Sequence, residues 1–283
     1  MPLKKVSQLQ RLMAAYGLPG TLYFASVWVR RRFQHAILGT PLTWRKFHLI
    51  HELAYIHNYR SMLEISTART GYTYNHIDRS RFDICRRLSY LTPNDWTDGA
   101  PVDYRSSNRD ISECLHQIRA QGLRFDIVFI DPWHEYECTR RDMQVAFSLV
   151  NDDGIIVMHD CAPQSEAAFF APSRGDLEEW YGVTYKAYLD VLLTRNHLWY
   201  CTVDADTGCG MIRSSQKTCL YKRAVDQDPA CIRAWHNVGD DYNASLRIYE
   251  GKRDSLMNVV TVSEFLAAEW QSRKSMTLSR PFA

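Results

Sequence analysis

The feature that most constrains the fold is a buried-strand pattern that ends in a cluster of polar residues. Ile127–Ile130 is a continuous apolar run rich in β-branched residues, which is typical of a strand buried on both faces of a parallel sheet. The run ends at Asp131-Pro132-Trp133-His134. Ligands of open α/β sheets bind outside the carboxyl ends of the strands, so Asp131 and His134 are candidate site residues.

The same pattern occurs again in the following part of the chain. Gly154–Met158 is a second apolar run, and it leads into His159-Asp160-Cys161. Two neighbouring buried strands that each deliver an aspartate beside a histidine to one sheet edge indicate a functional site. The alternative is that these polar residues only begin loops and cap the helices that follow.

The composition fits a globular protein and excludes several other classes. The chain has 283 residues, of which 46% are hydrophobic and 23% charged, as is ordinary for one large α/β domain with additions or for two small domains. A net charge of +2 does not indicate a nucleic-acid-binding surface over the whole protein. The eight cysteines include no CxxC pair, which favours neither a zinc site nor a disulfide framework and predicts a cytoplasmic protein. We find no apolar run of about 18 residues and no secretory signal, so we expect no transmembrane segment.

The first 60 residues are expected to be helical. An amphipathic run near the N-terminus is expected to stop at Gly17-Leu18-Pro19-Gly20, since glycine and proline end helices. A second run, Thr21–Phe33, is rich in aromatic residues and carries Arg30-Arg31-Arg32. Such a basic run could contact an acidic membrane surface or an anionic carrier, although it is more often one solvated end of a helix. A third helix is expected at about Pro41–His57.

The first strand of the sheet is followed by a turn whose single glycine is Gly71. Strand-to-helix turns of this kind bind small molecules through backbone N–H groups and the helix N-terminus. The second strand is expected at about Arg81–Ile84. In it, Asp83 lies nineteen positions after Glu64, close to the spacing at which a strand-end acid binds a ribose hydroxyl in nucleotide-binding βαβ units. Asp78 is the alternative acid.

The rest of the chain alternates predicted strands and helices, which is typical of an α/β protein with a mostly parallel sheet. Residues 162–182 contain several prolines and glycines and are the natural place for a lid over a site. Beyond Lys217 the chain is expected to be helical. The predicted strands are 61–66, 101–108, 127–130, 154–158, 197–203 and 210–213, and the predicted helices are 111–121, 137–150 and 183–194.

This strand–helix order, closed by a pair of strands, resembles the fold of class I S-adenosylmethionine-dependent methyltransferases. Residues 63–73 resemble the first motif of that family, an acid followed by a glycine-rich turn. Residues 125–142 and 154–163 resemble the fourth-strand and fifth-strand signatures of a bacterial subgroup. That subgroup includes macrocin-type and other sugar O-methyltransferases and enzymes described as cephalosporin hydroxylase-like. Residues 180–187 and 208–210 are similar to the corresponding tail of sequences from bacterial surface-glycan gene clusters.

The resemblance covers about residues 61–213 and implies an α/β, Rossmann-like, seven-stranded and mostly parallel sheet with helices on both faces. It implies three parts: an N-terminal helical extension over residues 1–60, a methyltransferase domain over 61–215 and a C-terminal helical extension over 216–283. The terminal helices are candidates for a homodimer interface.

The resemblance implies that S-adenosylmethionine binds over the first strand. Glu64 and the turn from Ser66 to Gly71 would hold its methionine part, and Asp83 would hold the ribose. The family usually has glycine at the position of Ser66, where glycine lets the backbone approach the cofactor. The Ser66 side chain must therefore point away or narrow the pocket. The full set of implied cofactor-binding residues is Glu64, Ser66, Gly71, Asp83, Asp131 and, near the adenine, Ser107 or Asn108.

The resemblance also implies methyl transfer to a hydroxyl group, assisted by Mg²⁺ or another divalent cation. Hard cations prefer carboxylate oxygens, so Asp131 and Asp160 would hold the cation. His159 is a candidate third ligand, although it and Cys161, which flank Asp160, would suit a softer metal better. His134 is the candidate general base because a free imidazole titrates near neutral pH, with Asp131 as the other catalytic residue. The alternative for His134 is a purely structural role.

The acceptor implied by the resemblance is a sugar, a glycan or a small natural product, with no nucleic-acid partner and at most a weak peripheral membrane contact. A rival interpretation is a methyltransferase-like docking subunit of a glycan-assembly system that has lost its cofactor. Ser66, Thr70 and Pro132, which replace small residues of the family, favour this rival. A nucleotide-dependent oxidoreductase is a second rival, but the sequence lacks the GxGxxG motif that such enzymes use.

Overall fold

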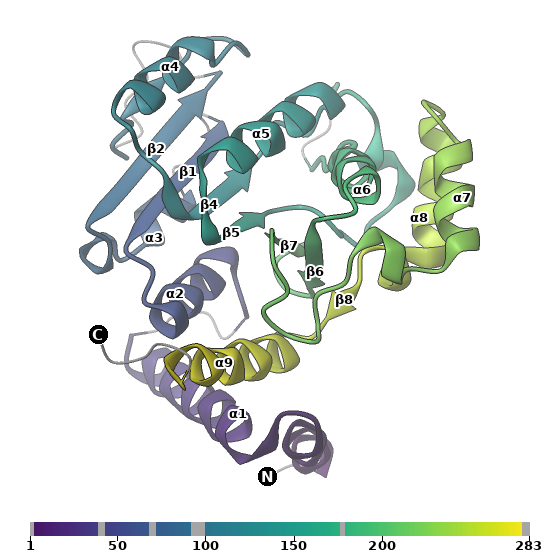
Figure 1. Ribbon diagram of the computed structural model, residues 1–283. Helices are drawn as coiled ribbons and strands as arrows, with labels where there is room; N and C mark the ends of the chain where they lie inside the picture. Colours follow the sequence, from purple (N-terminus) through teal and green to yellow (C-terminus); the bar gives the residue numbers. More distant parts are fainter. Residues whose placement is uncertain (1–2, 39–42, 68–71, 92–99, 176–178, 279–283) are drawn as a thin grey trace.

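In the computed structural model, the two apolar runs of the sequence are neighbouring strands at the centre of one sheet (Figure 1). β4 (Phe125–Asp131) pairs in parallel with β5 (Val150–Met158) on one side and with β1 (Ser61–Thr67) on the other. The structure describes residues 3–38, 43–67, 72–91, 100–175 and 179–278.

The sheet of the described residues has eight strands in the order β3-β2-β1-β4-β5-β7-β6-β8. β7 (Cys209–Arg213) lies antiparallel between β5 and β6 (Trp199–Val203), so the predicted closing pair of strands is confirmed. The strand order reverses between β1 and β4, and ligands of open α/β sheets bind at the carboxyl side of such a reversal. The remaining strands are β2 (Ile84–Tyr90), β3 (Tyr104–Arg105) and β8 (Val259–Val260).

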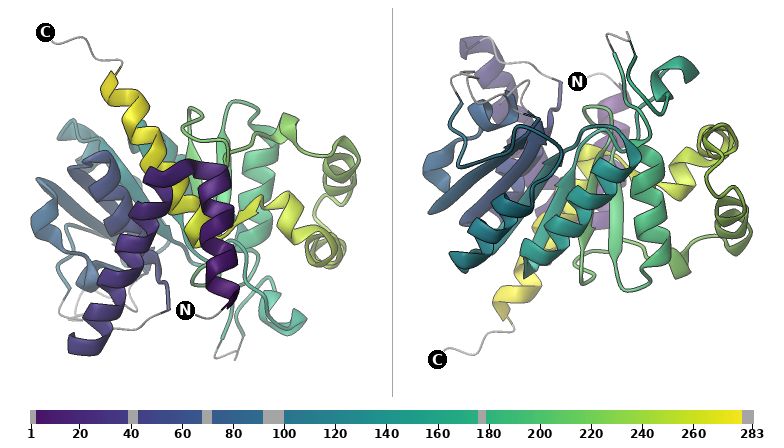
Figure 2. Two further views of the ribbon diagram at one scale, coloured as in Figure 1. Left: turned by 90° about the horizontal axis from the view of Figure 1, so that it is seen from below. Right: turned by 90° about the horizontal axis from the view of Figure 1, so that it is seen from above.

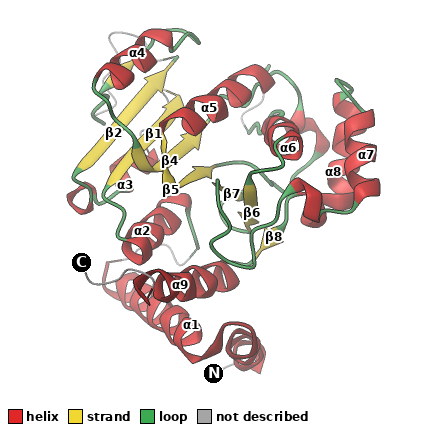
Figure 3. Ribbon diagram, viewed as in Figure 1, coloured by secondary structure: helices red, strands yellow, loops and turns green. Residues whose placement is uncertain are grey.

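Helices cover both faces of the sheet, as predicted (Figure 3). Val128 and Ile130 of β4 point into one apolar core, and Ile127 and Phe129 point into the other. Successive side chains of a strand point to opposite faces, so this double burial explains the continuous apolar sequence of β4. The first core is covered by α4 (Ser112–Ala120), α5 (Tyr136–Leu149) and α6 (Thr184–Thr194), and the second by α1 (Leu3–Leu38), α2 (Lys46–His57) and α9 (Val262–Leu278). The other helices are α3 (Tyr72–His76), α7 (Pro229–Asn237), α8 (Tyr242–Leu256) and the short 3₁₀ segments Arg79–Arg81, Ala167–Phe170 and Ala224–Asp226.

The second strand differs from the sequence prediction. β2 begins at Ile84, where the predicted strand ended, so Asp83 precedes the strand and lies at the amino edge of the sheet. Arg86 and Arg87 concealed this strand because they interrupt its apolar pattern. Arg87 is fully buried in the structure and pairs with Glu64 of β1, its neighbour in the register. A buried cation is tolerated where it has such a partner.

The terminal segments also correct the prediction. The segment beyond Lys217 is not only helical, because β8 joins β6 as an eighth strand in place of the expected seven-stranded sheet. The predicted stop near Gly17 is a kink within α1, where Gly17 has φ 63° and ψ −178°. The kinked α1 packs along α9 and forms the outermost layer when the molecule is seen from below (Figure 2, left). Within the described part of the chain, no helix has the combined length and apolar character that crossing a bilayer requires.

Candidate active site

The carboxyl ends of β1, β4 and β5 surround a cavity of about 330 Å³. Asp131, His134 and Asp160, which the sequence places beyond two buried strands, all line it. The cavity therefore lies at the edge where the strand order reverses, as expected for a ligand site. Its other lining residues are Lys46, Ser66, Thr67, Tyr72, Pro132, Trp133, His159, Arg174 and Trp180.

Asp131, at the end of β4, lies between two cationic groups from different elements. Lys46 Nζ at the start of α2 is 2.7 Å from Asp131 Oδ2, and His159 Nδ1 after β5 is 3.2 Å from Asp131 Oδ1. Burial alone would raise the pKa of Asp131, but Lys46 and His159 outweigh burial and lower that pKa below its ordinary value. Asp131 is therefore an ionised carboxylate at neutral pH.

His159 acts as a charge partner of the aspartates. Its Nδ1 lies 3.0 Å from Asp160 Oδ2 as well as near Asp131. Burial opposes charge on His159, but Asp160 and Asp131 outweigh burial and raise its pKa well above the ordinary value. Among the described residues, ligand atoms of Asp131, His134 and Asp160 lie within 4.8 Å of one another, so His134 is a candidate metal ligand in addition to the predicted His159.

Asp160 follows β5 in the left-handed backbone region, with φ 55°, where aspartate is among the more tolerated residues. The turn between β6 and β7 fixes this position. Thr207 donates a hydrogen bond to Asp160 Oδ1, and the backbone N–H groups of Cys161 and Ala162 donate to carbonyl oxygens of that turn. Gly208 in the turn has φ 88°, and a Cβ there would lie 2.5 Å from the backbone nitrogen of Ala162. Only glycine fits this close approach.

The hydrogen-bond partners of His134 fix the roles of its two ring nitrogens. Nδ1 lies 2.6 Å from the carbonyl oxygen of Trp180, and because a carbonyl only accepts, Nδ1 carries the hydrogen. Nε2 lies 3.0 Å from Asp160 Oδ2. In a neutral imidazole with Nδ1 protonated, Nε2 and the carboxylate oxygen would both be acceptors. A shared proton or a cation is therefore required between His134 and Asp160.

Glu64 and Ser66 of β1 form a buried polar network behind the cavity. Ser66 Oγ donates to Glu64 Oε1 at 2.9 Å, and Arg87 Nε lies 3.6 Å from the same oxygen. Burial raises the pKa of Glu64 to about 7, although Arg87 and Ser66 oppose this shift. Because the Ser66 hydroxyl bonds to Glu64, its side chain is directed into this network.

Three predicted cofactor residues, Asp83, Ser107 and Asn108, do not line this cavity. Asp83 lies at the opposite edge of the sheet, exposed, where Arg60 Nη2 donates to its Oδ1 at 2.8 Å. Ser107 and Asn108 follow β3, are exposed and do not line the cavity. Gly71 lies outside the described residues.

Sequence reasoning missed Lys46 and Arg174, which line the cavity, and Asp206, which contacts Lys46. Asp206 Oδ2 accepts from the backbone N–H of Lys46 at 3.1 Å, and Asp206 Oδ1 accepts from Arg45 Nη1 at 2.6 Å. Asp206 could have been found, because a turn that leads into an antiparallel strand beside β5 starts at the carboxyl edge. Lys46 carries no comparable signal, since nothing in its local sequence indicates a contact with β4.

The loop after β5, expected as a lid, forms one wall of the cavity. The ring centroid of Trp180, in this loop, lies 5.3 Å from that of Trp133 and 5.4 Å from that of His134. Trp180 Nε1 donates to the carbonyl oxygen of Ala171 at 2.7 Å. The wall nearest His134 is therefore aromatic.

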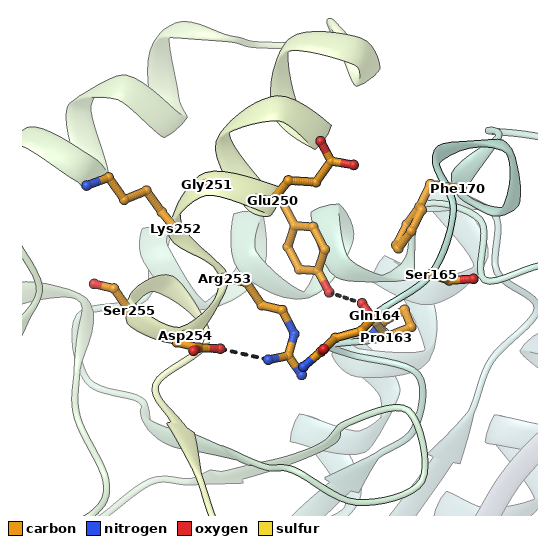
Figure 4. A pocket seen from close by; sticks show the side chains of 11 residues that line it. Pro163, Gln164, Ser165, Phe170, Glu250, Gly251, Lys252, Arg253, Asp254 and Ser255 are labelled. Atoms are coloured by element: carbon orange, nitrogen blue, oxygen red, sulfur yellow. Dashed lines mark hydrogen bonds and ion pairs between the residues drawn. The ribbon is translucent and has the colours of Figure 1, made fainter.

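A separate and larger cavity of about 550 Å³ lies between the start of this loop and α8 (Figure 4). On its floor, Arg253 Nη2 donates to the carbonyl oxygen of Ala162 at 2.8 Å, and the Tyr249 hydroxyl donates to that of Pro163 at 2.7 Å. These bonds hold the backbone that directly follows Asp160 and Cys161. The contacts of α8 thus support the geometry of the candidate active site from outside.

Comparison with known proteins identifies a domain that contains this edge. Residues 60–161 match the family described as "Methyltransferase domain". No curated protein sequence matches the chain.

Several solved structures are similar at low sequence identity. An O-methyltransferase from Bacillus cereus in complex with SAH has 15% identity and a TM-score of 0.44, with 66% of this chain and 90% of that chain covered. The SAH-bound methyltransferase PaMTH1 from Podospora anserina has 12% identity and a TM-score of 0.43, with 76% and 97% covered. The MycE methyltransferase of the mycinamycin biosynthetic pathway, in complex with Mg, SAH and mycinamycin VI, has 16% identity and a TM-score of 0.39, with 62% and 49% covered.

Proposed function

We propose that this protein is a class I S-adenosylmethionine-dependent methyltransferase, since residues 60–161 match the family described as "Methyltransferase domain", and that it methylates a hydroxyl group of a sugar, a glycan or a small natural product. One observation carries the proposal. A single cavity is lined by Ser66 and Thr67 at the end of β1 and by Asp131 and Asp160 at the ends of β4 and β5. A methyl donor held at β1 and an acceptor held at β4 and β5 would share this space, as an in-line displacement requires.

Glu64 supports binding of the donor at β1. Its Oε2 is buried and has no hydrogen-bond partner among the described residues. Glu64 does not itself line the cavity, so it would act on the donor through Ser66, which donates a hydrogen bond to it. The Ser66 side chain turns toward Glu64, so it leaves the adjoining cavity open. S-adenosylmethionine would supply an electrophilic methyl group on a sulfonium there. The chain would contribute position and the exclusion of water.

Asp131 and Asp160 would hold a divalent cation, which would lower the pKa of the acceptor hydroxyl. The two carboxylates converge at one cavity with His134, and the pKa values of both carboxyls are lowered, despite burial, by neighbouring charged groups. The donor set of two carboxylates and one imidazole therefore fits a divalent cation. Lys46, 2.7 Å from Asp131, would compete with that cation for the same carboxylate.

His134 has two candidate roles that different observations favour. Its Nδ1–H bond to Trp180 leaves Nε2 facing the cavity beside Asp160, as a general base that accepts the acceptor's proton needs. The same geometry suits a third metal ligand, because metal-bound histidines commonly donate their other N–H to a carbonyl. His134→Gln separates the roles: metal affinity stays and kcat falls for a base, whereas metal affinity itself falls for a ligand.

A sugar acceptor is supported by the aromatic wall of the cavity. Trp133 and Trp180 both line it, and aromatic rings pack well against the apolar faces of pyranose rings. This favours a sugar or a glycosylated natural product over a peptide.

Calorimetry with S-adenosylhomocysteine, with and without Mg²⁺, tests the proposal. We expect saturable one-site binding to the wild-type protein, and tighter binding or a larger thermal shift when Mg²⁺ is present. Asp131→Asn should remove the effect of Mg²⁺. Absence of any heat or thermal shift with the wild-type protein would instead support the docking-subunit alternative, for which no cofactor is needed.

A further inference from the structure

The outer face of α1 carries a stripe of large, exposed apolar side chains. Leu18, Leu22, Val29 and Phe33 are 54%, 57%, 59% and 66% exposed. At 100° per residue these four positions fall within about 60° of one another around the helix axis. Soluble proteins rarely align so many exposed apolar side chains on one helix face unless the face meets a partner or a membrane. We call these four residues the α1 stripe.

The opposite face of α1 is fixed to the rest of the protein. The Tyr23 ring stacks on that of Trp270 in α9, with 4.1 Å between the ring centroids, and its hydroxyl donates to Glu52 of α2 at 2.5 Å. Val27 is 1% exposed. Arg31 Nη2 donates to the carbonyl oxygen of Thr43 at 2.9 Å. These contacts hold α1 in one orientation, and in this orientation the α1 stripe faces away from the core.

The charge of α1 is entirely of one sign. The helix from Leu3 to Leu38 contains no aspartate or glutamate. Arg32 lies beside the α1 stripe, about 40° from Leu18 around the helix axis. Arg30 lies on its other flank with its side chain 46% exposed, and it pairs with Glu52 of α2, so Arg32 is the main cation beside the stripe. The basic residues of the helix are Lys4, Lys5, Arg11, Arg30, Arg31 and Arg32.

We propose that the α1 stripe and its flanking arginines dock this protein on an anionic lipid bilayer. An apolar helix face bordered by arginine and aromatic residues is the composition of helices that lie in the membrane interface. Anionic headgroups attract each basic residue near the surface. This inference stands independently of methyl transfer, since none of the docking residues lines the candidate active site.

The charge of α1 favours a bilayer over a second copy of the chain. In a two-fold dimer through this face, the arginines beside one α1 stripe would meet those of the other, and like charges at an interface disfavour association. An anionic surface complements the same charges.

Docking would also orient the candidate active site. α2 follows α1 in the chain, lies between the α1–α9 layer and the sheet (Figure 1), and supplies Lys46 to the cavity. The bilayer-facing layer and the site are therefore separated by one helix. A membrane-associated acceptor would be near the cavity.

Sedimentation of the full chain with lipid vesicles tests the proposal. We expect binding to vesicles of phosphatidylcholine mixed with phosphatidylglycerol, weak binding to phosphatidylcholine alone, and loss of binding as salt rises. The variant L22Q/V29Q/F33S should bind at least about tenfold more weakly, because it removes the apolar contact. Arg32→Gln should weaken binding about fivefold and reduce the salt dependence.

Matched substitutions elsewhere serve as controls. Val225 is 57% exposed, like Val29, but lies in the segment Ala224–Asp226, so Val225→Gln should bind as the wild type does. Arg119→Gln is the exposed arginine control on α4. The proposal is overturned if the wild-type protein does not sediment with anionic vesicles at low salt, or if Val225→Gln weakens binding as much as the stripe variant. A concentration-dependent dimer that L22Q/V29Q/F33S dissociates would also overturn it, in favour of a second copy.

Discussion

At the residue scale, the geometry of the candidate site depends on a few residues with positive φ angles, which most side chains disfavour. Asp160 has positive φ, and Gly208 and Gly182 allow two loops to approach within contact of the residues beside Asp160 and His134. Asp131, His134 and Asp160 could be predicted from the sequence because each lies within four residues after the end of an apolar run. Lys46 could not, because its contact with Asp131 spans 85 residues of chain and depends on how α2 packs.

Gly182 gives a test of this close packing. Its φ is +54°, and a Cβ there would lie 2.2 Å from the carbonyl oxygen of His134. Gly182→Ala should destabilise the protein by ~1–2 kcal/mol for the left-handed backbone and by a further ~1–3 kcal/mol for the clash. Gly239→Ala is the matched control, since Gly239 has φ +50° with nothing within 4 Å of its Cβ position. Thermal unfolding of both variants measures the difference, and equal losses would show that the loop accommodates the extra atom freely.

The buried pair of Arg87 and Glu64 gives a second test. Arg87→Met leaves the Glu64 carboxyl buried without its cation, which should cost ~3–5 kcal/mol of stability near pH 8. The double variant Arg87→Met/Glu64→Gln should recover much of that loss, because no ionisable group then remains at this point of β1 and β2. Denaturant unfolding of the wild type, Arg87→Met, Glu64→Gln and the double variant gives the coupling energy. A coupling near zero would mean that the two side chains, 3.6 Å apart, contribute independently.

At the element scale, the strands with unbroken apolar runs could be predicted, and the strand that carries charge could not. β4 and β5 could be predicted from their continuous apolar sequences. β2 could not, because it contains Arg87, whose partner Glu64 lies on another strand. The attachment of α9 was likewise hidden, because it depends on Glu269. That carboxylate accepts from Tyr221 at 2.6 Å and from Arg213 at 3.1 Å, and lies 2.5 Å from His57 of α2. Such long-range ion pairs leave no periodic signal in the sequence.

Glu269 makes the attachment of α9 dependent on pH. Burial alone would raise the pKa of Glu269, but Arg213 and His57 outweigh it and lower that pKa to about 2, from an ordinary value of 4.5. A carboxyl whose folded pKa is lowered stabilises the fold above its unfolded pKa, and this contribution is lost as the pH falls from about 4.5 toward 2. Glu269→Gln should destabilise the protein by ~3–5 kcal/mol at neutral pH, because Arg213 stays buried without its carboxylate.

Unfolding measured between pH 7 and pH 2.5 checks this expectation. The gap in stability between the wild type and Glu269→Gln should narrow as the pH falls through 4.5. Glu113→Gln, at an exposed position of α4, should follow the wild type at every pH. A gap of constant size would assign the effect of Glu269→Gln to packing and not to charge.

At the scale of the whole molecule, the candidate site contains residues from segments that are far apart in the sequence. The family match covers residues 60–161, yet Lys46 comes from the N-terminal segment and Asp206 from the turn between β6 and β7. The C-terminal segment completes the sheet with β8 and holds α1 through α9. The α/β class and the main strand order could be predicted because they follow from local patterns. The contacts of the terminal segments with the site could not be predicted, because they depend on surfaces that form only in the folded chain.

The link between Lys46 and Asp131 gives a test of this joining. Lys46 supplies a positive charge at the carboxylates where a divalent cation would bind, so Lys46→Met should lower stability in the absence of metal, since Asp131 and Asp160 then repel with less compensation. For the same reason it should bind Mn²⁺ or Mg²⁺ about tenfold more tightly, or by ~1.4 kcal/mol. Added metal should therefore raise the unfolding temperature of Lys46→Met more than that of the wild type.

Lys217→Met is the matched control, because Lys217 pairs with Asp153 at 2.6 Å, away from the cavity, and its response to metal should equal that of the wild type. If metal stabilises Lys46→Met and the wild type equally, Lys46 does not share Asp131 with a cation, and the N-terminal segment contributes to the site only through packing.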